Sequence, residues 1–344
     1  MTDRLRVVIA TPLSEENIAL LREREPRLEI AHDPTLLAEP SPNWMVPHVR
    51  TPEEQVEYER LVDTAEALYG VPDHSGRALA RTVAANPALR WVHTIPAGGG
   101  QQIKAAGLPR EALERIRFTT SAGVHARPLA EFAVFGVLAG AKLLPYLTTA
   151  QRRHEWAPRR VMGLARDMTV AVVGLGSIGR LTATLLAGLG YRVIGVHRRE
   201  VEADVERIYP VEAFAEAASI SDAIVLALPG TEQTERMLSA EVLAAIKPGA
   251  TVVNVGRGTT VDEPALIAAL QDGRVGFAAL DVAYVEPLPA DSPLWDLPNV
   301  LVSPHTAAIS DHEPRLIAEL FAENARRLLD GEPLINPVNT REFY

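Results

Sequence analysis

Cysteine is absent from the 344 residues, which excludes disulfide bonds and metal sites with thiolate ligands. Long hydrophobic runs are also missing, and none approaches the ~20 residues of a membrane-spanning helix. The first apolar run, residues 5–10, is interrupted by Arg6 and predicts a strand rather than a signal peptide. Positive charge does not predominate, because the net charge is −10, which argues against a general nucleic-acid binder. We therefore expect a cytoplasmic protein with no membrane or nucleic-acid partner and no bound metal.

The length suits about two domains of ~150 residues each. Apolar, β-rich runs alternate with helical patterns along most of the chain, which predicts an α/β fold with parallel sheets. About five strands are expected before residue 121, and six near-continuous apolar strands between residues 169 and 304 indicate a second sheet covered on both faces. An almost wholly apolar helix, Pro128 to about Leu144, should be buried between domains or subunits. An amphipathic helix from Glu313 to Leu329 follows the second sheet.

The segment VVGLGSIGRL contains a G-x-G-x-x-G pattern formed by Gly174, Gly176 and Gly179. It follows a predicted strand and opens a predicted helix, which is the context of a dinucleotide-binding loop. Side chains at these glycines would block the tight turn or the close approach of a pyrophosphate, and the helix N-terminus offers free N–H groups. We therefore expect the loop to bind a dinucleotide, with Ser177 and Ile178 also in contact.

The turn after the next strand reads His197, Arg198 and Arg199, where such folds usually place an acid that holds the ribose hydroxyls of NAD. An acid would repel the 2′-phosphate of NADP, whereas guanidinium groups suit phosphate geometry. The alternative is a solvated basic turn. We predict a preference for NADP, with NAD also possible.

Three further segments, NVGRGTTVDE, LDVAYVEPLP and LVSPHTAA, each follow or complete a predicted strand. Ligands bind at the carboxyl ends of strands in open α/β sheets, so Arg257, Glu286 and His305 could converge there. Singly, these residues could be a surface arginine, a turn marker before Pro287 and a structural histidine. Together they supply an anion clamp, an orienting carboxylate and an acid/base group, which the reduction of a 2-keto acid requires.

These segments resemble the D-2-hydroxyacid dehydrogenase family in the patterns N-x-G-R-G, D-V-x-x-x-E-P-L-P and P-H-T. ALPGTEQTERML, IKPGATVVNVGRG and SPLWDLPNVLVSPH are similar too, and the likeness extends from about Ala67 onward. The resemblance implies a Rossmann cofactor domain, residues 128–310, inserted into a flavodoxin-like α/β substrate-binding domain, residues 1–127 plus 311–344. The active cleft would lie at the seam of the two domains.

The resemblance also implies a role for each site residue. Hydride would pass from C4 of the nicotinamide to the keto carbon, while His305 donates a proton to the carbonyl oxygen. Glu286 would hydrogen-bond His305 and favour its protonated form, and Arg257 would bind the substrate carboxylate. Backbone amides of Gly98 and Gly99, in IPAGGGQQ, would cradle the same carboxylate. Further cofactor contacts are implied at Pro229, Val255 and Asp281, with Asp281 holding the nicotinamide carboxamide.

The leading hypothesis is an NADPH-dependent reductase that converts a small 2-keto acid, such as glyoxylate or hydroxypyruvate, to the D-2-hydroxy acid. An NAD-linked phosphoglycerate-type dehydrogenase and a nucleotide-sensing transcriptional corepressor stay open as alternatives. The family commonly pairs through its cofactor domains, so a homodimer is expected, and no regulatory domain is expected after residue 344. In the Pro40–Pro52 loop, Trp44, Met45 and His48 either shape the substrate pocket or form a surface hairpin.

Overall fold

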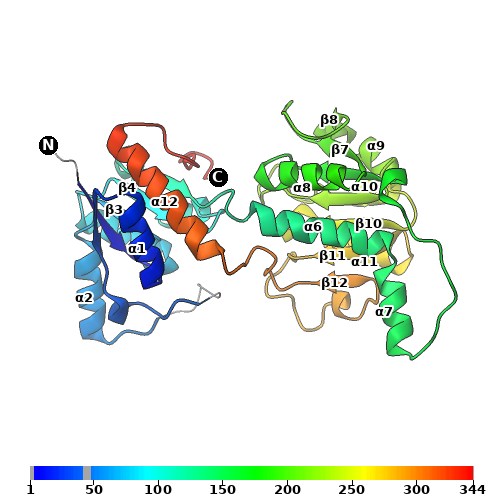
Figure 1. Cartoon of the computed structure of the whole chain (residues 1–344), viewed down its shortest axis with the longest axis horizontal. Coiled ribbons are helices and arrows are strands. Elements are labelled where there is room, and N and C mark those ends of the chain that lie inside the picture. Colours follow the sequence, from blue (N-terminus) through cyan, green and yellow to red (C-terminus); the bar gives the residue numbers. More distant parts are fainter. Residues whose placement is uncertain (1–3, 42–47, 344) are drawn as a thin grey trace. The chain divides into compact units, whose positions relative to one another are not determined.

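The computed structural model describes residues 4–41 and 48–343, which form two compact units (Figure 1). The first unit comprises Met1–His125 and Ile309–Tyr344, and the second comprises Ala126–Ala308. Each contains one parallel β-sheet with helices packed on it. The α/β class with parallel sheets that the sequence predicts is therefore confirmed.

The sheet of the first unit has five parallel strands in the order β2-β1-β3-β4-β5, which is the flavodoxin-like order. Its strands are β1 (Leu5–Ile9), β2 (Leu28–Ala31), β3 (Ala67–Tyr69), β4 (Trp91–Thr94) and β5 (Arg117–Thr120). Its helices are α1 (Glu15–Arg24), α2 (Pro52–Val62), α3 (Gly76–Ala85), α4 (Gly100–Ala105), α5 (Arg110–Arg115) and α12 (Glu313–Asp330). The short helices α4 and α5 were not predicted from the sequence, because six residues are too few for a clear helical period.

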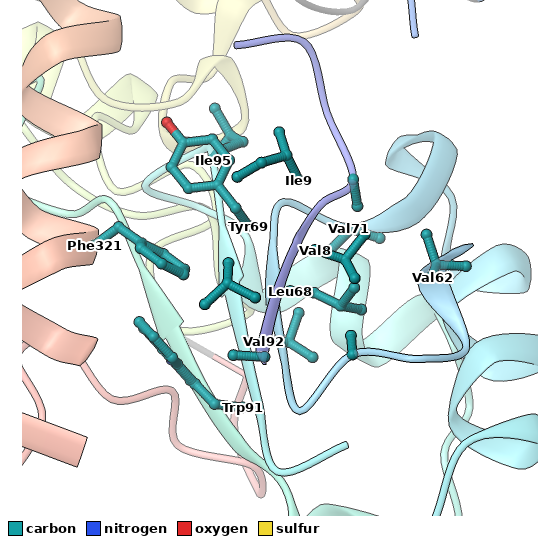
Figure 2. Packing of buried hydrophobic residues seen from close by; sticks show 14 of the residues in the cluster. Val8, Ile9, Val62, Leu68, Tyr69, Val71, Trp91, Val92, Ile95 and Phe321 are labelled. Carbon is teal, nitrogen blue, oxygen red and sulfur yellow. The ribbon is translucent and has the colours of Figure 1, made fainter. Parts of the chain in front are cut away.

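Helix α12 returns from the C-terminal part of the chain to complete the core of the first unit, beside α1. Phe321 on α12 is fully buried and stacks on Trp91 of β4, with ring centroids 4.4 Å apart (Figure 2). The ring of Tyr69, on β3, meets the ring of Phe321 edge-on, with 5.1 Å between the ring centroids. The indole Nε1 of Trp91 donates to Thr119 Oγ1 at 2.9 Å, so the buried polar atom is satisfied. The amphipathic pattern of the last helix thus reflects packing against this sheet.

The second unit has a seven-stranded parallel sheet in the order β12-β11-β10-β9-β6-β7-β8. Its strands are β6 (Thr169–Val173), β7 (Arg192–Val196), β8 (Ile208–Tyr209), β9 (Ala223–Leu226), β10 (Ala250–Asn254), β11 (Val275–Leu280) and β12 (Val300–Val302). Six of these were expected, and the two-residue edge strand β8 was missed because it is too short to give a pattern. The order is that of a doubly wound dinucleotide-binding sheet. Successive strands are added on one side of β6 up to β8 and on its other side from β9 onward, so the strand order reverses between β6 and β9.

Helices cover both faces of this sheet: α6 (Ala126–Ala141) and α8 (Ser177–Gly188) pack on one face. The opposite core cluster includes side chains of α9 (Phe214–Ser219), α10 (Ala240–Ala245) and α11 (Glu263–Gln271). Gly136 and Gly140 let α6 approach β10 closely, because a Cβ on Gly136 would lie 2.8 Å from a methyl group of Val253. The helices on the two faces together bury the near-continuous apolar strands on both sides.

The predicted helix from Pro128 to about Leu144 corresponds to α6, which ends three residues earlier and is followed by a second helix. Helix α6 ends at Ala141, Leu143 adopts a left-handed conformation with φ 56°, and α7 (Leu144–Arg152) begins after it. Within the described residues no single helix is long and apolar enough to cross a membrane. Together α6 and α7 pass that length and composition test, but they are bent by 69°. Half of α6 is buried against the sheet, which accounts for its apolar composition.

Candidate active site

The glycine loop joins β6 to α8 where the strand order reverses. Gly174 has φ 93°, and a Cβ there would lie 2.8 Å from Ala227 O, so only glycine fits. A Cβ on Gly179 would overlap the carbonyl oxygen of Gly174. Gly176, the N-cap residue of α8, instead faces open space, with no atom within 4 Å of a Cβ built there. The loop therefore leaves room for a pyrophosphate at a helix N-terminus, and its residues fit a dinucleotide.

The turn after β7 carries the basic residues singled out in the sequence. Arg198 Nη1 lies 3.5 Å from Gln233 Oε1, in the loop after β9. A cavity of about 610 Å³ lies beside the turn and is lined by Arg198, Arg199 and Arg207 together with acidic and apolar side chains of residues 200–210. This space and these guanidinium groups suit a phosphate-bearing ligand.

His197 connects this turn to the glycine loop. Its Nδ1 accepts a hydrogen bond of 3.2 Å from Leu175 N. Burial, followed by the positive charges of Arg198, Arg180 and Arg199, lowers the pKa of the imidazole. The sequence indicated only that an acid was missing at this position, and the link to Leu175 was not foreseen.

The other predicted cofactor contacts lie on the same edge of the sheet. Pro229 follows β9, Val255 follows β10, and Ser177 and Ile178 form the first turn of α8. A Cβ on Gly256 would lie 2.6 Å from the carbonyl oxygen of residue 228, so the turns after β9 and β10 pack directly together. The structure therefore brings these positions to adjoining turns.

Asp281 directly follows β11 and is 1% exposed. Its Oδ1 accepts hydrogen bonds from Ser303 Oγ (2.6 Å), Thr306 N (3.0 Å) and Ala307 N (2.9 Å). Its backbone oxygen accepts a further bond from His305 N at 2.9 Å. Asp281 thus holds the turn after β12 that carries His305. This role was not predicted from the sequence, although a buried acid at a strand end must find donors, which is a signal that the sequence offers.

His305 and Glu286 form a hydrogen-bonded pair, with 2.7 Å between Nδ1 and Oε2. The other carboxylate oxygen of Glu286 accepts from Ala283 N at 3.1 Å, which orients it. The side chains are 45% and 38% exposed, so the pair is open to a substrate. Because Nδ1 of His305 faces the carboxylate, Nε2 is the nitrogen that can exchange a proton with a ligand.

Arg257 lies in a turn after β10 that Asn254 fixes. Asn254 Nδ2 donates to Arg257 O, and Asn254 Oδ1 accepts from Gly256 N, both at 3.0 Å. A Cβ on Gly258 would overlap the carbonyl group of Ala283, so this turn packs against the loop after β11. The amide of Ala283 also donates to Glu286, which is hydrogen-bonded to His305. The turns that carry the three predicted catalytic residues, Arg257, Glu286 and His305, therefore adjoin one another.

Gly98 and Gly99 lie in the first unit, in the turn after β4. The amide of Gly99 donates to Pro96 O at 3.1 Å and is therefore engaged within the turn itself. Trp44 and Met45, in the proline-rich loop, lie outside the described residues. A contribution of either segment to substrate binding stays a prediction.

Six strand ends of the second unit thus carry a dinucleotide cradle, an arginine and a carboxylate-backed imidazole, at the edge where open α/β sheets bind ligands. Within residues 4–41 and 48–343, no three His, Asp or Glu side chains are grouped to hold a metal ion. This fold and site define a nicotinamide-nucleotide-dependent oxidoreductase.

Comparisons with known proteins identify the family. The model of the D-isomer specific 2-hydroxyacid dehydrogenase NAD-binding domain matches residues 134–307. A glyoxylate reductase of Korarchaeum cryptofilum is 34% identical over 240 residues, 67% of this chain and 71% of that protein. The structure of a D-isomer specific 2-hydroxyacid dehydrogenase from Xanthobacter autotrophicus Py2, in complex with NADPH and MES, is 31% identical with a TM-score of 0.78, covering 99% of this chain and 100% of that chain. The chain belongs to the D-isomer specific 2-hydroxyacid dehydrogenase family.

A D-3-phosphoglycerate dehydrogenase of Methanocaldococcus jannaschii is also 34% identical, over 215 residues, but this chain spans only 41% of that protein. Family membership confirms the resemblance drawn from the sequence and the Rossmann fold of the second unit. The chain is an NAD(P)-dependent oxidoreductase that transfers a hydride between the nicotinamide and a small 2-keto or 2-hydroxy acid.

Proposed function

We propose that the chain reduces glyoxylate or hydroxypyruvate to the D-2-hydroxy acid with NADPH as the preferred reductant. The observation that carries this proposal is the basic turn His197–Arg199 in place of an acid, beside a cavity that can admit a phosphate. Two relatives support it: the Xanthobacter structure contains NADPH, and the Korarchaeum relative is named a glyoxylate reductase. NAD is expected to bind more weakly.

In this proposal each strand-end residue has a defined task. When bound, NADPH supplies a hydride from C4 of its nicotinamide to the keto carbon. His305 donates the Nε2 proton to the carbonyl oxygen, and Glu286 accepts the hydrogen bond from Nδ1 and orients the ring. Arg257 pairs with the substrate carboxylate and polarises the carbonyl. Asp281 keeps the His305 turn in place and contacts the nicotinamide carboxamide.

The first unit is proposed to be the substrate-binding domain, which gives a domain division near residues 127 and 311. Amides around Gly98 and Gly99 would provide a second anchor for the carboxylate. Because the amide of Gly99 is engaged by Pro96 O, its use would require the turn to rearrange. Replacement of Gly98 by Pro, which removes the amide N–H, tests this anchor with KM for glyoxylate as the readout, and an unchanged KM would contradict it.

The cofactor and substrate are tested by kcat/KM for NADPH and NADH with glyoxylate, hydroxypyruvate, pyruvate and a bulky 2-keto acid. We expect NADPH to be favoured by at least about tenfold, equivalent to ~1.4 kcal/mol. A preference for NADH would contradict the cofactor assignment. Turnover of phosphohydroxypyruvate alone would favour the phosphoglycerate-type enzyme, and no turnover with any acid would favour the nucleotide sensor.

The assignment of the acid/base group is tested by His305→Gln, which should lower kcat by about 10²- to 10⁴-fold. His312→Gln is a suitable control, because His312 is exposed and its nearest acidic partner, Asp311, is 3.8 Å away. Equal activities of the two variants would contradict the role of His305.

We also propose a homodimer formed through the second unit. Large apolar side chains are exposed along α6, α7 and the segment after α7, which is typical of a protein interface. They are Phe135 (45% exposed), Leu147 (44%), Trp156 (104%), Val161 (96%) and Leu164 (50%). Trp156→Ser combined with Val161→Ser should convert a dimer to a monomer in light scattering, whereas Leu189→Ser, at the exposed residue directly after α8, should not. A wild-type protein that stays monomeric at all concentrations would refute the proposal.

A further inference from the structure

The Leu175 peptide, in the middle of the glycine loop, is held from two sides. Its N–H donates to His197 Nδ1 at 3.2 Å, and its carbonyl oxygen accepts from Arg180 Nε at 2.9 Å. Its side chain is fully buried against β7, where a Cβ on Gly195 would lie 2.6 Å from Leu175 Cδ1. The loop that would face the pyrophosphate is therefore fixed to the turn that would face the adenosine ribose.

The bond from Leu175 also fixes the protonation state of His197. A ring nitrogen that accepts an N–H hydrogen bond carries a lone pair, so the single ring proton lies on Nε2. The charged groups that act on the ring are Arg198, Arg180 and Arg199, and together with burial they lower its pKa. The imidazole is therefore a neutral donor at pH values where an ordinary histidine begins to charge.

We propose that His197 is a specificity-determining residue for NADPH, which donates a hydrogen bond from Nε2 to a 2′-phosphate oxygen while its Nδ1 holds the glycine loop. The proposal rests on the proposed function, because it takes NADPH as the cofactor. A carboxylate at this position accepts bonds from ribose hydroxyls, whereas phosphate oxygens can only accept and therefore need donors. Histidine supplies such a donor without adding charge, and Arg198 and Arg199 supply the charge.

The surroundings of the turn have the space and charge that this role needs. The adjoining cavity of about 610 Å³ is lined by His197, Arg198 and Arg199. The lining also contains Arg207 and three acidic residues, Glu200, Glu202 and Glu206, of which Glu206 is paired with Arg192 at 3.2 Å, which offsets its repulsion of a phosphate.

Three substitutions separate the two tasks of His197. His197→Asn keeps an acceptor near the position of Nδ1 but removes the donor at Nε2. His197→Gln keeps an amide donor near the position of Nε2 but removes the acceptor for Leu175. His197→Asp introduces the acid that a 2′-phosphate would meet in an NAD-type site.

The readout is calorimetric binding of 2′,5′-ADP and of 5′-AMP to the full chain, since the two nucleotides differ only in the 2′-phosphate. The selectivity is the ratio of the two dissociation constants. We expect it to fall about tenfold in the Asn variant, to stay within about threefold of wild type in the Gln variant, and to fall about 100-fold in the Asp variant. Wild-type selectivity in the Asn variant, or equal losses in the Asn and Gln variants, would overturn the proposal.

The neutral state of the ring is tested by comparing wild type with His197→Asn from pH 6.5 to 8.5. The titration of the phosphate is common to both proteins, so the ratio of their selectivities should be constant. A ratio that rises toward pH 6.5 would show a charged imidazole and overturn the neutral-donor proposal. Because binding is measured without turnover, a protein that reduces glyoxylate with NADPH but binds 2′,5′-ADP independently of residue 197 refutes this inference alone.

Discussion

His93 gives the first unit a sensitivity to acid that can be worked out from its surroundings. The imidazole lies on β4, is fully buried, and contacts Thr119 Oγ1 at 2.8 Å through Nδ1 and Ser121 Oγ at 3.1 Å through Nε2. Burial lowers its pKa to about 3, whereas a histidine in an unfolded chain titrates near ~6.5. The folded first unit therefore keeps this ring neutral over a wide range of pH.

The sign and size of the effect follow from proton linkage. Because the folded pKa lies below the unfolded one, the unfolded chain takes up the proton first as the pH falls. Above pH ~6.5 the titration of this group does not change stability, and between there and a pH of about 3 stability falls by about 1.4 kcal/mol per pH unit. At pH 5 the loss amounts to roughly 2 kcal/mol.

The measurement compares wild type with His93→Gln, which is neutral at every pH. Amide hydrogen exchange of peptides covering β4, corrected for the intrinsic pH dependence of exchange, reports opening of the first unit alone, which is necessary because a two-unit chain need not unfold in one step. We expect the variant to be less stable at pH 7.5, because hydrogen bonds are lost, and the gap to narrow by roughly 2 kcal/mol at pH 5. Ser121→Ala, which keeps the histidine, should retain the wild-type pH dependence.

Two results would refute this reasoning. One is a stability difference between wild type and His93→Gln that does not change between pH 7.5 and pH 5. The other is an NMR titration in which the His93 ring of the folded protein charges near pH 6.5. Either would mean that water or a conformational change relieves the burial of the imidazole.

Three further predictions concern packing and the site. Phe321→Ala removes the fully buried ring stacked on Trp91 and should lower the free energy of unfolding of the first unit by about 3–5 kcal/mol, measured by denaturant unfolding. Gly176→Ala should change stability by less than about 1 kcal/mol, since the residue has φ −76° and faces open space, but should weaken NADPH binding by at least about tenfold in a fluorescence titration. Asp281→Ala should lower kcat by about 10²-fold in NADPH oxidation because the His305 turn loses its acceptor, and Asp281→Asn, which keeps an acceptor oxygen, should be affected less.

Much of the architecture could be predicted from the sequence because apolar strands and glycine turns have local patterns. The glycine loop was predicted because Gly174 and Gly179 satisfy steric needs that no other residue meets. Helix α7 was not predicted, and neither was the bend before it, since the left-handed conformation of Leu143 has no signal in its residue type. Edge strand β8 was missed for a different reason, namely its length of two residues.

The site was predicted in part for a similar reason. Arg257, Glu286 and His305 follow strands, and a parallel sheet places its carboxyl ends along one edge, so their neighbourhood on that edge follows from topology. The hydrogen bonds that fix these residues could not be predicted in this way. Asp281 binds amides 25 and 26 residues away, and His197 binds an amide 22 residues away, so these pairs form only when the chain folds.

The hydrogen bonds of Asp281 and the hydrogen bond of His197 nevertheless share one feature of the sheet. β11 and β12 are neighbours in the sheet, and Asp281, after β11, holds the turn after β12. β6 and β7 are also neighbours, and His197, after β7, holds the loop after β6. A polar side chain at one strand end is therefore within reach of the unpaired amides of the adjacent turn, and it serves there as a positioning group. At these two strand ends, the strand order alone places the polar residue beside the turn that it holds.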